Sequence, residues 1–171
     1  MRGMKPAIAP AARIIVTGGT FDKRYDAIKG ELTFKETHLP AMLEQARVTL
    51  PLTTDIRLLI DSLQMNDAHR QGVLDACREA PETALVVIHG TDTMVQTAEV
   101  VGRAGLAKTV VFTGAMVPYS VQGSDAEFNL GFALAMALAL PAGAYVAMNA
   151  RVFPWNDVQK DKQEGTFKAL R

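Results

Sequence analysis

The stretch VVIHGTDTM, residues 86–94, contains the pattern on which the rest of this chain is built. It continues an apolar run from residue 84, and such an uninterrupted run is typical of a parallel strand buried on both faces. Gly90, Thr91 and Asp92 then form a polar loop. Residues 93–96 match the T-x-x-Q capping box that opens many helices. A strand, a polar loop and a helix in this order indicate one unit of a parallel α/β sheet.

The same alternation recurs along the chain. Strand-like apolar runs occupy residues 13–16, 56–60, 84–89, 109–113 and 144–148, and helix-like stretches occupy residues 39–47, 67–79, 94–104 and 126–140. A second capping box, at residues 124–127, marks the start of the last helix. We therefore expect residues 1–171 to form a single doubly wound α/β domain, in which helices cover both faces of a mostly parallel sheet. Ligands of such sheets bind beyond the carboxyl ends of the strands.

The charge balance narrows the class of partner. Eighteen basic and eighteen acidic residues cancel in a chain of 171 residues. A neutral chain lacks the electrostatic footprint of nucleic-acid or anionic-membrane binding, so we expect neither partner and favour a small neutral or zwitterionic molecule. Cys77 is the single cysteine, which excludes a disulfide framework and fits a reducing, cytoplasmic location.

The longest apolar run, LGFALAMALAL at residues 130–140, is too short to cross a bilayer, which takes about 18 residues or more. It is apolar all round, and this indicates a buried helix or a helix that packs on another subunit. We therefore expect a homo-oligomer, either a dimer or a tetramer. Residues 1–12 are expected to be disordered.

Another polar strand end lies at RIIVTGGTFDKRY, residues 13–25. Gly18 and Gly19 follow an apolar strand but lead into a charged loop rather than a helix. A phosphate site needs a helix N-terminus directly after its glycines, so this turn is not one. Two interpretations stay open: a tight turn that requires positive φ, or a backbone that must approach a ligand closely. Residues 21–33 are expected to form a mobile loop or hairpin.

Further polar positions have both a structural and a functional interpretation. Thr91 and Asp92 are expected to be exposed beyond their strand, where either side chain can cap the next helix or meet a ligand. Asp61 and Ser62 end another strand, where the serine could hold a substrate carboxylate, although nearby helix capping explains the same residues. Lys160 lies among charged residues, the usual sign of a solvated face. The local sequence does not decide between these interpretations.

Taken in chain order, these segments resemble the bacterial-type L-asparaginase family. The two main motif regions of the family correspond to TGGT at residues 17–20 and HGTDTM at residues 89–94. Further matches are the pair at residues 61–62, the segment FTGAMVP at residues 112–118, and DVQK at residues 157–160. The matches cover nearly the whole chain, which resembles the N-terminal, catalytic domain of the family and its flavodoxin-like fold.

This resemblance implies hydrolysis of L-asparagine to L-aspartate and ammonia, with no cofactor and no metal. Thr20 corresponds to the nucleophile, and Tyr25 to a loop tyrosine that would orient or deprotonate the Thr20 hydroxyl. Thr91, Asp92 and Lys160 correspond to a second cluster. In that cluster the lysine would tune the threonine hydroxyl, and the aspartate would also bind the α-amino group of the substrate.

The resemblance also implies a set of substrate contacts, in which Ser62 would hold the α-carboxylate: Gly19, Asp61, Ser62, Gly90, Asp92 and Ala115. A threonine hydroxyl has a pKa far above neutral, so it needs a neighbouring lysine or tyrosine before it can attack an amide. Two alternatives remain open. One is a broader amidase that also accepts glutamine, and the other is a non-catalytic module that binds asparagine or aspartate.

Overall fold

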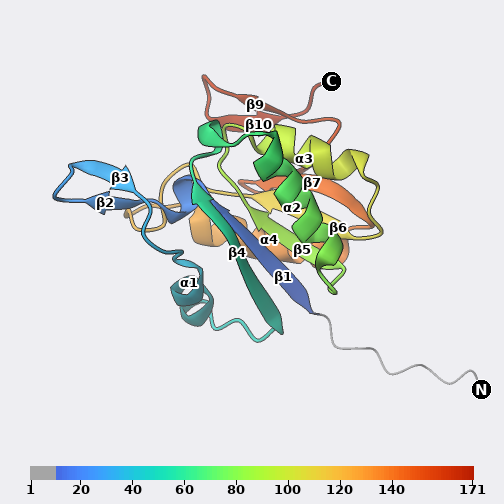
Figure 1. Ribbon diagram of the computed structural model, residues 1–171, viewed down its shortest axis with the longest axis horizontal. Helices are drawn as coiled ribbons and strands as arrows, with labels where there is room; N and C mark the ends of the chain where they lie inside the picture. The colour runs from blue at the N-terminus through green and yellow to red at the C-terminus, as the bar shows by residue number, and fades with distance from the viewer. Residues whose placement is uncertain (1–10) are drawn as a thin grey trace, which may run out of the picture.

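A mostly parallel sheet of six strands runs through residues 11–171, the part of the chain that the computed structural model describes (Figure 1). Five neighbouring strands run parallel, and the strand at one edge runs antiparallel to its neighbour. In order across the sheet, the strands are β4 (Leu52–Ile60), β1 (Ala12–Gly18), β5 (Ala84–Ile88), β6 (Thr109–Thr113), β7 (Gly143–Met148) and β8 (Arg151–Pro154).

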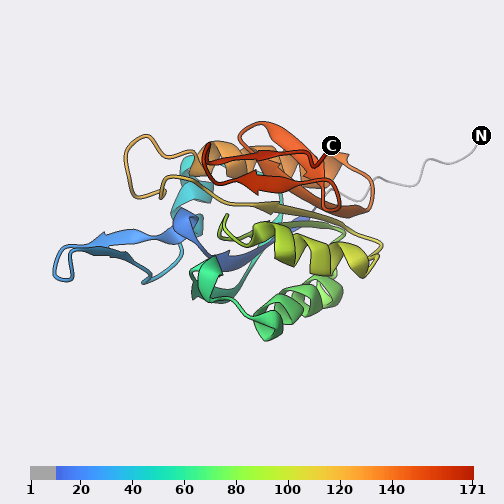
Figure 2. The same cartoon turned by 90° about the horizontal axis from the view of Figure 1, so that it is seen from above.

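Helices cover both faces of this sheet (Figure 2). The helices α2 (Asp67–Glu79) and α3 (Met94–Arg103) share one hydrophobic core with one face. The helices α1 (Leu39–Gln45) and α4 (Ala126–Ala139) share a second core with the opposite face. All residues of β5 and β6 are buried, as the uninterrupted apolar runs predict. The doubly wound α/β fold expected from the sequence is confirmed.

The strand order contains one reversal, the kind of position at which open α/β sheets bind their ligands. From β1 the chain moves outward to β4, and it then returns to β5 on the other side of β1. The order of strands therefore reverses between β1 and β5. In an open α/β sheet the loops after such strands diverge, which leaves room for a ligand at their carboxyl ends.

Short strands outside the alternating pattern complete the fold. The strand β2 (Arg24–Asp26) pairs with β3 (Glu31–Thr33), and β9 (Gln159–Asp161) pairs with β10 (Thr166–Lys168). Strands of three residues that are rich in charge leave no apolar run in the sequence. The sequence therefore gave a hairpin only as one option for residues 21–33, and it did not predict the second hairpin. The first hairpin, residues 24–33, is called the arm below, and it projects away from the sheet in both views (Figures 1 and 2).

The helices begin where the sequence predicts, but the predicted capping boxes are wrong. The N-cap residues of α3 and α4, Thr93 and Asp125, make no side-chain capping bond. The Thr93 hydroxyl instead donates to the Ser62 carbonyl (2.8 Å), and the Ser124 hydroxyl donates to the Val117 carbonyl (2.7 Å). Both hydroxyls therefore donate to backbone carbonyls outside their helices, and the Ser124 Oγ also accepts from the Ala126 N–H (3.0 Å) at the start of α4. The capping box that does form lies at the start of α2, between Asn66 and His69.

Two expectations about the ends and surfaces of the fold change. Ala12 is fully buried in β1, so disorder does not extend to residue 12, and residues 1–10 lie outside the described part of the chain. The helix α4 is buried on one side only, because Phe128 and Leu138 remain 59% and 44% exposed. Within residues 11–171, no helix combines the length and apolar character needed to span a membrane.

Candidate active site

Glycines allow three strand ends to meet at one edge of the sheet. Gly19, just after β1, has φ of 83°, and a Cβ there would overlap the Cα of Gly90, just after β5. A Cβ on Gly90 would lie 2.6 Å from the Oγ of Ser62, just after β4. The Gly19 N–H also donates to the Ile60 carbonyl (3.0 Å). The turn thus requires positive φ, and the backbone that approaches it closely is that of the protein itself.

Thr20 and Thr91 lie on the two sides of this glycine contact. Thr20 follows Gly19 and begins a short 3₁₀ turn, Thr20–Asp22, in which its side chain is half-buried. Thr91 follows Gly90 and is 6% exposed, so the expectation that it is exposed is wrong. Both threonines therefore stand at the carboxyl edge of the sheet, where β1 and β5 end and the strand order reverses.

Tyr25 lies farther along the chain, on the arm. It sits on β2 opposite Leu32 of β3, and it is 64% exposed. This places the tyrosine hydroxyl in solvent on a projecting hairpin. The described geometry brings Thr20 to the sheet edge and leaves Tyr25 outside the packed part of the molecule.

A buried lysine joins Thr91 and Asp92. Lys160, on β9, places its Nζ 2.8 Å from the Thr91 Oγ1 and 2.7 Å from the Asp92 Oδ1. The lysine side chain is 11% exposed and the aspartate side chain 39%. A solvated face, the usual interpretation of a lysine among charges, is therefore wrong for Lys160. An ammonium only donates, so its bond to Thr91 leaves the threonine proton free to point elsewhere.

The end of β4 is occupied by two polar contacts. The Ser62 Oγ accepts from the Thr93 N–H (3.2 Å), and Ser62 is 2% exposed. The Asp61 Oδ2 accepts from the Lys23 Nζ (2.6 Å). The bond from Lys23 holds the pKa of the Asp61 carboxyl below its ordinary value, against a smaller opposing effect of burial. Lys23 thereby ties the segment after Thr20 to the end of β4.

His89, the last residue before the Gly90–Thr91 loop, forms a hydrogen bond to the backbone of this loop. It is fully buried, with its Nδ1 2.7 Å from the Gly90 carbonyl oxygen and its Nε2 2.7 Å from the Thr97 Oγ1. A carbonyl only accepts, so Nδ1 carries the proton and Nε2 accepts from the threonine. Burial lowers the pKa of His89 to about 4. The imidazole is therefore neutral near pH 7 and fixes the backbone before Thr91.

The loop after β6, residues 114–124, also borders the candidate site, next to the ends of β1, β4 and β5. It is called the bridging loop below. Gly114 packs so closely on the His89 carbonyl that a Cβ would overlap it, and that Cβ would lie 3.5 Å from the Thr91 Cγ2. Ala115, the next residue, is 1% exposed. The backbone of this loop therefore borders the Thr91 cluster directly.

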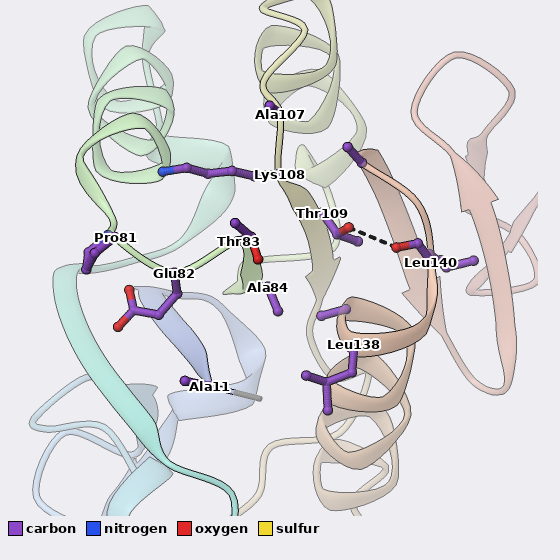
Figure 3. A pocket seen from close by; sticks show the side chains of 12 residues that line it. Ala11, Pro81, Glu82, Thr83, Ala84, Ala107, Lys108, Thr109, Leu138 and Leu140 are labelled. Carbon is purple, nitrogen blue, oxygen red and sulfur yellow. Dashed lines mark hydrogen bonds between the residues drawn. The ribbon is translucent and has the colours of Figure 1, made fainter. Parts of the chain in front are cut away.

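A hollow at the opposite edge of the sheet, away from these residues, is shown in Figure 3. It has a volume of about 790 Å³ and is bordered by the first residues of β5 and β6 and the end of α4. Its Lys108 donates to the last carbonyls of α2, including that of Cys77 (2.6 Å), and its Glu82 pairs with Arg13 (2.7 Å). These charged groups close the ends of helices and strands, so the hollow lacks a catalytic constellation.

One family model matches almost the entire described chain. The model for the N-terminal domain of asparaginases covers residues 12–170. The chain belongs to the asparaginase family. Because the match includes the Thr20 segment, the Thr91 cluster and Lys160, the asparaginase resemblance found from five short motifs is confirmed at the level of the family.

Relatives and structures place the chain within the asparaginases. L-asparaginase 1 of Escherichia coli is 28% identical over 164 residues, a match that covers 89% of this chain and 48% of the relative. One component of the glutamyl-tRNA(Gln) amidotransferase of Thermococcus kodakarensis is 30% identical over 151 residues, covering 82% of this chain and 33% of that protein. The chain thus spans about half the length, or less, of these relatives.

Solved structures agree on the fold. L-asparaginase I of Vibrio cholerae superimposes with a TM-score of 0.83 at 24% identity, over 94% of this chain and 52% of that chain. A probable cytoplasmic L-asparaginase of Campylobacter jejuni gives 0.74 at 26% identity, over 88% and 49%. Both matches include about half of the solved chain.

Some residues of the site carry no signal of their own in the sequence. Lys23 is one basic residue in a charged loop, and nothing nearby predicts its bond to Asp61. Asp125 was part of an expected capping box, whereas its carboxylate in fact binds the bridging loop. Within residues 11–171, no group of three or more histidine, cysteine, aspartate or glutamate side chains is arranged to hold a metal ion.

Proposed function

We propose that this protein hydrolyses the side-chain amide of L-asparagine, with water as co-substrate and L-aspartate and ammonia as products. The observation that carries the proposal is the contact of the Lys160 Nζ with both the Thr91 Oγ1 and the Asp92 Oδ1. Family membership and the placement of this cluster at the strand reversal between β1 and β5 support the same conclusion.

In the proposed mechanism Thr20 is the nucleophile. Its hydroxyl attacks the amide carbon, ammonia leaves, and water then releases aspartate from the threonine ester. Backbone N–H groups beside Thr20 and Thr91 would stabilise the tetrahedral oxyanion, an effect of about 2.7 to 4 kcal/mol for each donor. Tyr25 would orient the Thr20 hydroxyl, and this role requires the arm to move toward the sheet edge.

The Thr91 cluster would supply the proton transfers. Lys160 donates to Thr91 and Asp92, so the Thr91 hydroxyl can direct its own proton toward the reacting group or a water. The Asp92 side chain is 39% exposed, and we propose that its exposed part binds the α-amino group of the substrate. Ser62 would bind the α-carboxylate, and backbone atoms of Gly19, Gly90 and Ala115 would complete the pocket.

A broader amidase is the second candidate. The relative from Thermococcus kodakarensis is an amidotransferase component, so amide chemistry in this family is not confined to proteins named asparaginase. One additional methylene in a pocket changes binding by only about 1 to 3 kcal/mol, and glutamine differs from asparagine by one methylene. The ratio of kcat/KM for the two amino acids distinguishes these functions.

Ammonia release by the purified protein tests the proposal. Thr20→Ala and Thr91→Val should each reduce kcat for L-asparagine by about 10²- to 10⁴-fold, because each removes a hydroxyl assigned to the reaction. Thr54→Val, on the exposed edge strand β4, is the matched control and should keep full activity. Full activity in both site variants would refute the mechanism.

Two other results would select an alternative. Equal kcat/KM for asparagine and glutamine would favour the broader amidase. A rise in melting temperature with asparagine or aspartate, without ammonia release, would favour a non-catalytic binding module. The cytoplasmic location and the homo-oligomeric state expected from the sequence are also part of the proposal, and the neighbour described as a probable cytoplasmic L-asparaginase supports the first of them.

A further inference from the structure

Asp125 joins three separate segments at the carboxyl edge of the sheet. Its Oδ1 accepts from the backbone N–H groups of Met116 (3.0 Å) and Val117 (3.0 Å) in the bridging loop. Its Oδ2 accepts from the side-chain amides of Asn129 (3.0 Å), in α4, and Asn149 (3.0 Å), in the turn between β7 and β8. All four partners are N–H donors, so a group that only accepts is required at this position.

The asparagines extend this network around the start of α4. Asn129 is fully buried, and its side chain donates to the Gly114 carbonyl (2.9 Å) and accepts from the Asn149 N–H (2.9 Å). Partial burial raises the pKa of the Asp125 carboxyl, but the bonds from Val117, Asn149 and Met116 outweigh it and leave the pKa below its ordinary value. The carboxylate is therefore ionised near neutral pH.

The bridging loop that Asp125 holds contacts both threonine segments. At its start, Gly114 packs against the His89 carbonyl and beside Thr91. In its middle, the Tyr119 N–H donates to the Phe21 carbonyl (3.3 Å), and the Ser120 Oγ donates to the Lys23 carbonyl (2.8 Å). One loop thus touches the residues after Thr20 and the residues before Thr91.

We propose that Asp125 is a positioning residue, which sets the placement of the Thr20 segment relative to Thr91 by anchoring the bridging loop. This inference rests on the proposed function, because it assigns a role in the same reaction. Asp125 is half-exposed, so truncation leaves no large cavity, and water can reach the donor of the exposed Met116, while the buried Asn129 keeps its bond to the Gly114 carbonyl. Loss of the anchor should therefore affect catalytic geometry more than folding, since a misplacement of about 1 Å can cost about 10²-fold in rate.

The first test compares Asp125→Ala with Asp75→Asn. Asp75 is a carboxylate on the surface of α2 that accepts only from side chains, such as Gln71 (2.9 Å), so its variant controls for loss of charge. Asp125→Ala should reduce kcat for L-asparagine by about 10- to 100-fold while KM changes by less than about threefold. Asp75→Asn should match the parent protein. Unchanged kcat in a folded Asp125→Ala variant would overturn the proposal.

A swap of donor and acceptor separates positioning from general destabilisation. Asp125→Asn keeps one oxygen for Met116 and Val117 but turns an NH₂ group toward the donors of Asn129 and Asn149. Adding Asn149→Asp restores an acceptor for that NH₂ group. The kcat of the double variant should be at least about tenfold higher than the kcat of Asp125→Asn. A double variant no more active than the single one would count against the network.

Hydrogen exchange provides a measurement that does not depend on catalysis. The Asp22 N–H donates to the Gly19 carbonyl (3.1 Å), and the Lys23 N–H donates to the Thr20 carbonyl (3.2 Å). In Asp125→Ala their exchange should accelerate together with that of residues 116–120, whereas α2 should be unchanged. If the parent protein releases no ammonia but this coupled exchange is seen, the proposed function fails and the positioning role stands. If exchange rises in the bridging loop alone, the positioning role is refuted.

Discussion

Thr91 and Thr20 stand at the same edge of the sheet, but the protein holds them in different ways. Thr91 is buried and accepts a hydrogen bond from Lys160, a residue 69 positions away in the chain. Thr20 is half-buried, and the chain after it leaves the sheet to form the arm, where Tyr25 is largely exposed. One half of the candidate site is therefore held by buried contacts, and the role proposed for Tyr25 in the other half would require a movement of the arm.

This difference has a physical reason. The donors and acceptors around Thr91 are fixed by buried backbone and by a neutral histidine, so they need no reorganisation when a substrate arrives. The arm consists of two three-residue strands with exposed side chains, and an isolated hairpin of this size has little stability of its own. We infer that the Thr91 cluster contributes preorganised electrostatics and that the arm controls access, as lids do in many enzymes.

The largest expected effect is at the half held by buried contacts. Lys160→Met should reduce kcat by about 10²- to 10⁴-fold, because it removes the donor shared by Thr91 and Asp92. Lys168→Met, on β10 of the same hairpin, is the control, since Lys168 pairs only with Asp161 at the surface. Steady-state ammonia release measures both variants. Equal rates of ammonia release in the two variants would show that the contact of Lys160 with Thr91 and Asp92 does not contribute to catalysis.

The second effect concerns stability and acts through His89. Its pKa is about 4 in the folded protein and 6.5 in an unfolded chain, so the unfolded chain binds the proton first as the pH falls. Stability should therefore decrease by about 3 kcal/mol between pH 7.5 and pH 4, and this contribution should be constant below that range. Urea unfolding at several pH values measures it.

A variant of His89 tests whether this residue causes the pH dependence of stability. His89→Gln should reduce the pH slope, although it lowers stability at neutral pH by breaking the contacts to Gly90 and Thr97. If the free energy of unfolding depends on pH in the same way in His89→Gln, a different group titrates. The buried histidine then does not explain the pH dependence of stability.

The smallest effect is expected on the arm. Tyr25→Phe should reduce kcat by about tenfold and leave stability unchanged, because the hydroxyl is in solvent until the arm moves. The same assay and a thermal melt measure these quantities, with Tyr145→Phe as the control for a hydroxyl that bonds to the Pro141 carbonyl (3.1 Å). A loss as large as that of Lys160→Met would mean that the two halves contribute equally.

Much of the fold follows from short-range patterns in the sequence. The uninterrupted apolar runs at β5 and β6 predict strands buried on both faces, and each helix begins within a residue or two of its expected start. The glycine pair at the end of β1 left positive φ and a close backbone approach open, and the structure shows both. The candidate site was found through motifs shared with a family, whereas each motif alone had a structural explanation that local sequence left open.

The side-chain contacts are less accessible to such reasoning. Thr93 and Ser124 look like helix caps, but each hydroxyl bonds to a residue brought near by the fold. Lys160 looks like a solvated lysine, yet it is the donor to Thr91. A local pattern records which bonds a residue is able to make, and the competition among partners is decided only when distant segments meet.

The sequence by itself determined the order of the five parallel strands and the four helices and the absence of a charge excess, because these depend on residue type and on near neighbours. The tertiary structure alone decided that Lys160 reaches Thr91 and Asp92, and that Asp125 anchors a loop touching both threonine segments. These contacts join residues far apart in the chain, and only the packing of the sheet, its helices and the last hairpin brings their atoms within hydrogen-bonding distance.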